Sequence, residues 1–265
     1  MSERNGRVRL LVGWGAVAAC VPYLTLKLAW LTGSGVGTTG SGAGMMADPK
    51  YVVGNLLTMG MDLVAVVVAL AFTYRWGQRL PSWLVLGPIW IGTGLLAPIA
   101  LGLPLGMVVQ GFAGGSATAA DNALDDWVYG IVYGGFTVQA ILLVTAFVLY
   151  ARTRWPHVFR LRIKDFQGPS PIQQRAIVGA AVVASVYGAL SLVWAFASGG
   201  RHAAVETAAQ QTFWVTQAAL SFAGAVGLLA LAYRWGRGRL LLPLTAAWLG
   251  TGVVFASGLY AALAL

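Results

Sequence analysis

The sequence predicts an all-α membrane protein that crosses the bilayer seven times, with a cytoplasmic N-terminus and an external C-terminus. Of the 265 residues, 58% are hydrophobic and only 9% are charged, against roughly 25% charged residues in an ordinary globular domain. The apolar runs exceed the ~18 residues that indicate a spanning helix, and such a helix satisfies its own backbone hydrogen bonds in hydrocarbon. Seven runs occur, at about 9–31, 52–74, 82–104, 127–150, 175–198, 212–234 and 240–263. We therefore expect one membrane domain over residues 1–265, located in the cell membrane.

The distribution of basic residues indicates the orientation of the helices. The net charge is +9, and 14 of the 17 Lys and Arg residues lie before the first run or in alternate loops. Loops rich in Lys and Arg stay in the cytoplasm, so these segments are expected to be cytoplasmic, with membrane lipid rather than nucleic acid as their partner. They hold Arg4, Arg7, Arg9, Arg75, Arg79, Arg152, Arg154, Arg160, Arg162, Lys164, Arg175, Arg234, Arg237 and Arg239.

Three ordered sequence matches predict an internal duplication. Tyr74–Gly77 recurs at Tyr233–Gly236, Trp90–Gly94 recurs at Trp248–Gly252, and Tyr23–Trp30 resembles Tyr187–Trp194, at offsets of 159, 158 and 164 residues. The copies would cover about 9–104 and 175–263, with 127–150 as a linker helix. Both copies enter from the cytoplasm, which predicts a parallel 3+1+3 pseudo-repeat with its axis along the membrane normal and a site between the halves. The matching glycines Gly92, Gly94, Gly250 and Gly252 indicate close helix contacts.

Two ionisable residues lie within the predicted spans. Asp62 falls midway along the second run, and Lys27 lies in the outer half of the first. A charge near the bilayer centre costs ~2.5–3.5 kcal/mol in insertion scales, so both are functional candidates. Lys27 should lie level with Asn55 to Thr58, roughly 8 Å from the level of Asp62 at the helical rise. It could bend toward Asp62 or extend outward to the interface.

The polar residues of the second run share one face, because Asn55, Thr58 and Asp62 are spaced i, i+3 and i+7. By the repeat offset, their counterparts in the sixth run are Trp214, Gln217 and Ser221, and Ser191 corresponds to Lys27. Only the first copy keeps its charges. This asymmetry favours a single site at the seam of the first, second and sixth helices. A structural role for Asp62 in joining two helices remains the alternative.

Aromatic side chains accompany these polar residues. Tyr23, Trp90, Trp214 and Trp248 lie within the spans, and their ring faces could stabilise a cation. The two histidines, His157 and His202, lie in loops, and the last run has no lysine for a retinal Schiff base. We therefore expect no metal and no cofactor.

In helix number, size, Trp content and the single acid Asp62, the chain resembles the small seven-helix membrane-bound terpene cyclases of natural-product biosynthesis. The resemblance implies an isomerase- or lyase-type enzyme in which Asp62 protonates the prenyl chain of a lipophilic substrate. Substrate-binding residues would be Tyr23, Lys27, Asn55, Thr58, Trp90, Trp214, Gln217, Ser221 and Trp248. Those enzymes carry a second essential acid in the later helices, where this chain has Ser221 or Gln217; Glu206 or Asp126 would have to replace it.

The alternative is a small-solute transporter. The 3+1+3 plan looks like that of sugar and vitamin carriers, whose halves rock around a midplane site. In this interpretation Asp62, Asn55, Gln139 and Gln217 would bind a polar or cationic solute.

Overall fold

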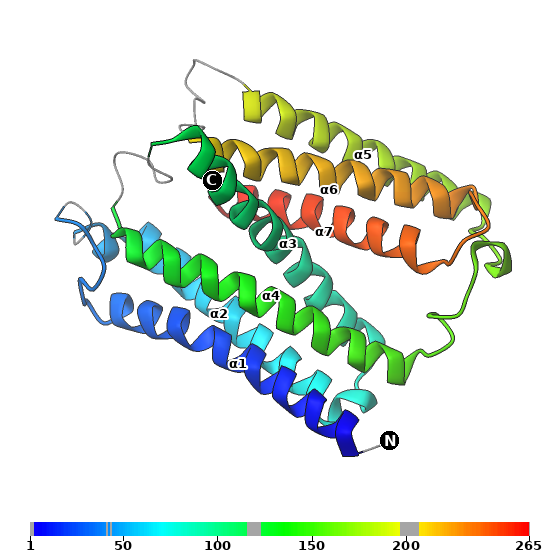
Figure 1. The fold of residues 1–265 in the computed structure, drawn as a ribbon, viewed down its shortest axis with the longest axis horizontal. Helices are drawn as coiled ribbons and strands as arrows, with labels where there is room; N and C mark the ends of the chain where they lie inside the picture. The colour runs from blue at the N-terminus through cyan, green and yellow to red at the C-terminus, as the bar shows by residue number, and fades with distance from the viewer. Residues whose placement is uncertain (1–2, 41, 43, 116–122, 197–206, 265) are drawn as a thin grey trace. The chain divides into compact units, whose positions relative to one another are not determined.

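The computed structural model describes residues 3–40, 42, 44–115, 123–196 and 207–264, and these residues form seven long helices (Figure 1). The helices are α1 (Glu3–Leu31), α2 (Pro49–Thr73), α3 (Ser82–Ala113), α4 (Asp126–Arg154), α5 (Pro171–Phe196), α6 (Ala208–Ala232) and α7 (Leu241–Ala264). All seven are long and apolar enough to cross a membrane, which confirms the predicted all-α, multi-pass class. Within the described ranges there is no β-strand, and the extended pairing is limited to two isolated bridges.

The predicted end of the third span was wrong. α3 does not stop at 104 but continues to Ala113, so the helix extends beyond the predicted run 82–104. Pro104 lacks an N–H and removes one helical hydrogen bond, but an apolar run follows it and the helix resumes its bonding there. At the start of α5, Pro171 occupies the first helical position, where its missing N–H costs nothing.

The chain divides into two compact units. The first comprises Met1–Ile89 and Thr118–Tyr150, and the second comprises Trp90–Ala117 and Ala151–Leu265. The first therefore contains α1, α2, the start of α3 and most of α4. The second contains the remainder of α3, the end of α4 from Ala151, and α5, α6 and α7. This division does not follow the predicted copies, because most of the third helix belongs to the unit that holds the second copy.

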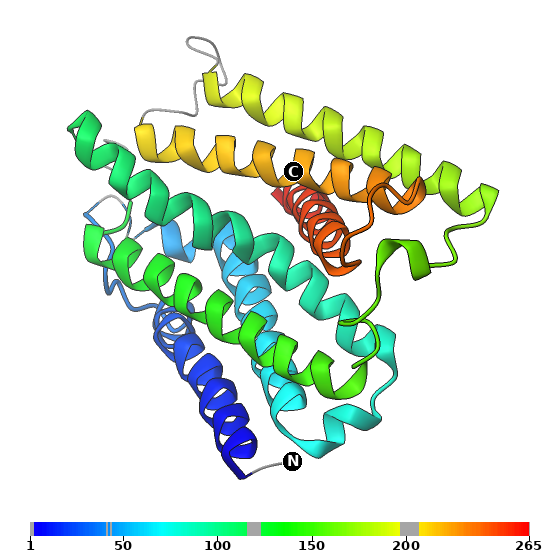
Figure 2. The same ribbon diagram turned by 45° about the vertical axis from the view of Figure 1, so that its right-hand side comes forward.

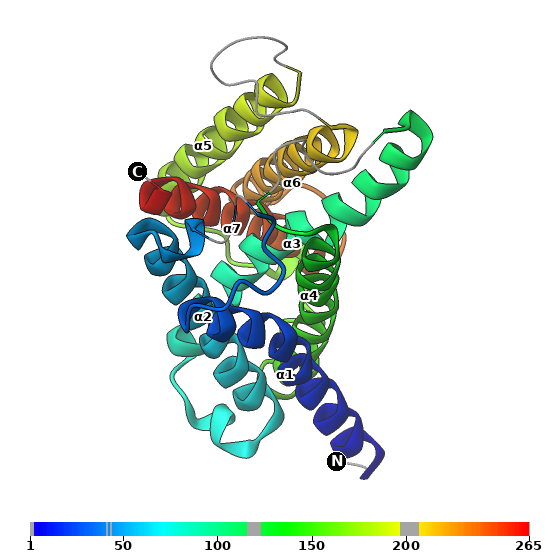
Figure 3. The ribbon, with the colours of Figure 1, turned by 90° about the vertical axis from the view of Figure 1, so that its left-hand side faces the viewer.

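In the first unit, α1, α2 and α4 lie side by side (Figures 1 and 3). One end is closed by aromatic packing, with the Phe72 ring centroid 5.1 Å from that of Tyr150. The other end is closed by a cluster that includes Leu26, Trp30 and Val128, and the Trp30 indole donates to the Val36 carbonyl at 2.8 Å. The polar side chains of this unit lie between these two apolar ends.

In the second unit, α6 packs between α5 and α7 (Figure 2). α6 and α7 approach so closely at Gly224 and Gly250 that a Cβ at Gly224 would lie 2.6 Å from the Gly250 Cα. α3 and α7 meet in the same way at Gly94 and Gly252. The predicted close contact at Gly92 was wrong, because a Cβ there would meet no heavy atom within 4 Å. Helix crossing geometry, rather than glycine content, decides which glycines touch a neighbour.

Candidate functional site

The predicted site residues fall in both units. Tyr23, Lys27, Asn55, Thr58 and Asp62 belong to the first unit, and Trp90, Trp214, Gln217, Ser221 and Trp248 belong to the second. Within each unit, predicted site residues also contact side chains that were not predicted as their partners. Asp62 contacts Gln139, and Gln217 contacts Tyr187 and Ser257.

Asp62 is buried in the first unit, with 6% of its surface exposed. Its Oδ1 accepts a hydrogen bond from Nε2 of Gln139 on α4 at 3.2 Å, and the same amide nitrogen lies 3.2 Å from Sγ of Cys20 on α1. The other oxygens of the pair, Oδ2 of Asp62 and Oε1 of Gln139, are buried and have no hydrogen-bond partner among the described residues. The pair thus has two acceptors that lack a donor.

Lys27 is also buried, at 7% exposure. Its Nζ donates to Oδ1 of Asn55 at 2.6 Å. Lys27 therefore lies level with Asn55, as the helical rise predicts. The ammonium lies 4.7 Å from the ring centroid of Tyr23 and 5.2 Å from that of Trp30, distances at which ring faces stabilise a cation. In the part of the chain that the structure describes, Lys27 forms its polar contact with Asn55 and makes no ion pair with Asp62.

Thr58 lies on the same helix face, but its hydroxyl bonds only to the backbone of its own helix among the described residues. Its hydroxyl donates to the carbonyls of Gly54 and Asn55 on its own helix, at 2.8 and 3.2 Å. Of the predicted row on α2, the two side chains with partners on other segments are therefore Asn55 and Asp62.

In the second unit, Gln217 is the centre of a neutral polar group. Its Oε1 accepts from the Tyr187 hydroxyl at 2.8 Å and from the Ser257 hydroxyl at 2.9 Å. Ser221 is fully buried and donates to the Gln217 carbonyl, one turn earlier on α6. Trp214 packs edge-on against Trp194, with ring centroids 5.1 Å apart.

Trp90 and Trp248 make equivalent contacts in opposite directions. The Trp90 indole donates to the Thr251 hydroxyl at 3.2 Å, and the Trp248 indole donates to the Thr93 hydroxyl at 3.0 Å. Tryptophan and threonine occupy matching positions in the two Trp-x-Gly-Thr-Gly segments. The segments therefore bind each other reciprocally, around the close approach of α3 and α7 described above.

Sequence reasoning did not pair Gln139 with Asp62. Gln139 lies in the predicted linker helix, outside the repeat, and the sequence predicts for it only the role of a solute ligand. A glutamine within an apolar span is itself a signal, since its amide needs partners in hydrocarbon. Of the acids considered as a second proton donor, Asp126 lies in the first turn of α4, and Glu206 lies outside the described residues.

No cluster of three or more His, Cys, Asp or Glu side chains suited to a metal ion occurs among the residues the structure describes. Comparison with protein-family models, curated proteins and solved structures finds no match.

Proposed function

We propose that this chain is a proton-coupled transporter of a small solute, with Asp62 as the proton-binding residue. The observation that carries the proposal is the Asp62–Gln139 pair, in which one oxygen of each side chain is buried without a donor. The transporter is proposed to consist of two parallel three-helix copies joined by α4, with the N-terminus in the cytoplasm and the C-terminus outside.

A single proton on Asp62 changes the balance of donors and acceptors in the pair. An ionised carboxylate is only an acceptor, whereas a protonated carboxyl group also has one O–H donor. A buried acceptor without a donor costs ~1–3 kcal/mol. The proton on Asp62 would supply the missing donor and lower this cost.

The charge on Lys27 favours the opposite state. Lys27 is a buried cation in the same unit, and its hydrogen-bond partner Asn55 is neutral. An ionised Asp62 would balance that charge across the low-dielectric interior. The two buried acceptors without a donor therefore favour the protonated acid, whereas the hydrogen bond donated by Gln139 and the charge on Lys27 favour the ionised one. Opposing demands of this kind suit a group that binds and releases a proton during a transport cycle.

The reciprocal contacts of Trp90 and Trp248 support the parallel duplication. Equivalent residues that bind each other in opposite directions are what a pseudo-twofold axis between α3 and α7 requires. Carriers with parallel repeats alternate by rocking one half against the other around a midplane site. The orientation rests on the 14 basic residues of the N-terminal segment and alternate loops.

The aromatic side chains support transport over cyclisation. Tyr23 faces the Lys27 ammonium, and a carbocation forming at that ring would be repelled by the charge already there. Within the second unit, Trp90 and Trp248 are engaged with the two threonines, and Trp214 packs against Trp194. The three tryptophan rings of the second unit are thus already used in these contacts.

A membrane-bound terpene cyclase is the second candidate, and the same pair supports it. An acid that starts prenyl cyclisation must hold a proton away from water, which fits a buried Asp62 whose Oδ2 has no hydrogen-bond donor among the described residues. Asp62 would then transfer its proton to an alkene or epoxide of a lipophilic substrate.

Reconstitution into liposomes tests the two candidates together. A pH-sensitive dye inside the vesicles would report proton movement on addition of sugars, amino acids, vitamins or organic cations, one at a time. We expect a solute that evokes proton flux with the native chain and none with Asp62→Asn. The matched control is Asp165→Asn, which makes the same change at an exposed cytoplasmic carboxylate and should leave flux intact.

Two results would decide against transport. No solute-evoked flux across the screen, with turnover of a prenylated phenol or quinone that is lost in Asp62→Asn, would establish the cyclase instead. Flux that is unchanged in Asp62→Asn would refute the role of Asp62 in proton coupling.

A further inference from the structure

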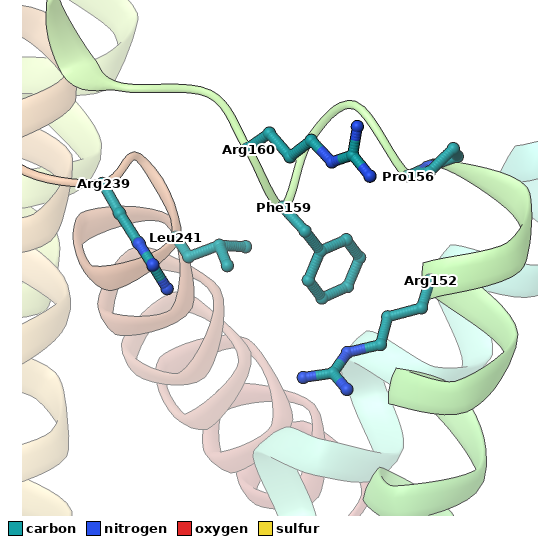
Figure 4. A pocket seen from close by; sticks show the side chains of 6 residues that line it. All are labelled: Arg152, Pro156, Phe159, Arg160, Arg239 and Leu241. Atoms are coloured by element: carbon teal, nitrogen blue, oxygen red, sulfur yellow. The ribbon is translucent and has the colours of Figure 1, made fainter.

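A cleft lined by arginines lies in the second unit. Its walls come from the end of α4, the turn that follows it, and the loop between α6 and α7 (Figure 4). The lining residues are Arg152, Pro156, Phe159, Arg160, Arg239 and Leu241. Three arginines and three apolar residues therefore line one concave surface.

The backbone fixes two of the cleft's segments to each other. Arg162 and Arg239 form an antiparallel bridge. The flanking bonds run from Ile163 N to Gly238 O at 3.1 Å and from Leu240 N to Leu161 O at 3.0 Å. Like charges directly opposite in such a bridge repel each other. The main chain thus holds Arg162 and Arg239 opposite each other. A bound anion would reduce the repulsion between their positive charges.

The surrounding loops offer almost no acidic partner. Residues 151–175 and 233–241 contain nine Lys and Arg residues and a single carboxylate, Asp165. Among the described residues, Arg152, Arg160 and Arg239 form no ion pair with a carboxylate. Arg152 instead lies with its guanidinium 5.7 Å from the ring centroid of Phe159, which orients the planar group. Arginine presents paired N–H donors that match the oxygens of a phosphate.

We propose that this cleft binds the phosphate group of an anionic membrane lipid. α4 ends at Arg154 and α7 begins at Leu241, so the cleft lies where two apolar spans meet the membrane surface. Basic pockets beside transmembrane helices on the cytoplasmic side bind lipid head groups in this way. Phe159 and Leu241 supply apolar surface for the glycerol and the first acyl carbons, and neither would serve a free inorganic anion. The assignment does not depend on the proposed transport function.

Lipid binding can be measured on the purified full chain in a neutral detergent. Phosphatidic acid, phosphatidylglycerol and phosphatidylcholine with identical short chains would be titrated, and bound lipid followed by native mass spectrometry. Inorganic phosphate would be titrated separately and followed by the thermal shift of the protein. We expect the two anionic lipids to bind at least ten-fold more tightly than phosphatidylcholine.

Arginine variants test whether the cleft is the site. Each of Arg152→Gln, Arg160→Gln and Arg239→Gln should weaken anionic-lipid binding about five-fold, the equivalent of ~1 kcal/mol per basic residue. Arg237→Gln is the control, because Arg237 lies in the same loop, is exposed and does not line the cleft. The melting temperature without lipid should be unchanged in all four variants.

Two results would overturn the proposal. Equal weakening in Arg237→Gln would mean that lipid is attracted by the whole basic surface and not by the cleft. Inorganic phosphate binding as tightly as phosphatidic acid, with phosphatidylglycerol no better than phosphatidylcholine, would identify a site for a soluble phosphate.

Discussion

Gly94 and Gly92 allow a matched test of the contact between α3 and α7. The two glycines lie in one motif, two residues apart on the same helix. A Cβ at Gly94 would lie 2.2 Å from the Gly252 carbonyl oxygen, whereas a Cβ at Gly92 would have no heavy atom within 4 Å. We therefore expect Gly94→Ala to destabilise the protein and Gly92→Ala not to.

The expected difference follows from three effects. A carbon normally approaches a carbonyl oxygen to about 3.3 Å, so the Gly94→Ala variant must separate the helices locally by about 1 Å, and overpacking of this kind costs ~1–3 kcal/mol. The same movement weakens the reciprocal bonds of Trp90 and Trp248, each of which contributes ~0.5–1.5 kcal/mol. Alanine regains ~1 kcal/mol of helix propensity at either site. Gly94→Ala should thus lower the free energy of unfolding by about 2 kcal/mol, and Gly92→Ala should raise it by up to ~1 kcal/mol.

Unfolding in mixed micelles with an increasing fraction of sodium dodecyl sulfate measures these free energies. Helix content by circular dichroism in neutral micelles serves as the control that both variants fold. Equal stability of the Gly94→Ala and Gly92→Ala proteins would refute the close approach of α3 and α7 and, with it, the main support for a pseudo-twofold axis.

Three further predictions concern the buried amides of Gln217 and Gln110 in the second unit. Gln217→Leu should cost about 2 kcal/mol, because the hydroxyls of Tyr187 and Ser257 lose the acceptor they share; Ser257→Ala removes one of these bonds and should cost about half as much by the same unfolding assay. Gln110→Leu should destabilise the junction of α3 and α6, because the side chain of Gln110 accepts from the Ala209 amide at 3.2 Å. Faster hydrogen exchange at the first turn of α6 is the expected readout, and unchanged exchange would contradict it.

The helices could be predicted from the sequence because an apolar run of sufficient length has one common solution in a bilayer. The contacts between side chains of different helices could not be predicted, because they depend on how the helices cross. Gly92 and Gly94 are alike in sequence, and only the crossing of α3 over α7 distinguishes them. Similarly, the helical rise placed Lys27 level with Asn55, but no periodicity could assign Gln139, on a helix outside the repeat, to Asp62.

The two proposed copies share the Trp-x-Gly-Thr-Gly segment but differ at the positions of the buried charges. The Trp-x-Gly-Thr-Gly contact is reciprocal, as expected for an interface that both copies build together. At the positions that correspond to Asp62 and Lys27, the second copy has Ser221 and Ser191, and both hydroxyls bond a carbonyl of their own helix. A serine satisfied within its helix requires nothing from its neighbours. Asp62 and Lys27, in contrast, each form a hydrogen bond with a side chain of another helix. Oδ2 of Asp62 still has no donor among the described residues. The proposed interface between the copies needs both of them to be alike, whereas the proposed proton site needs only one of them to differ.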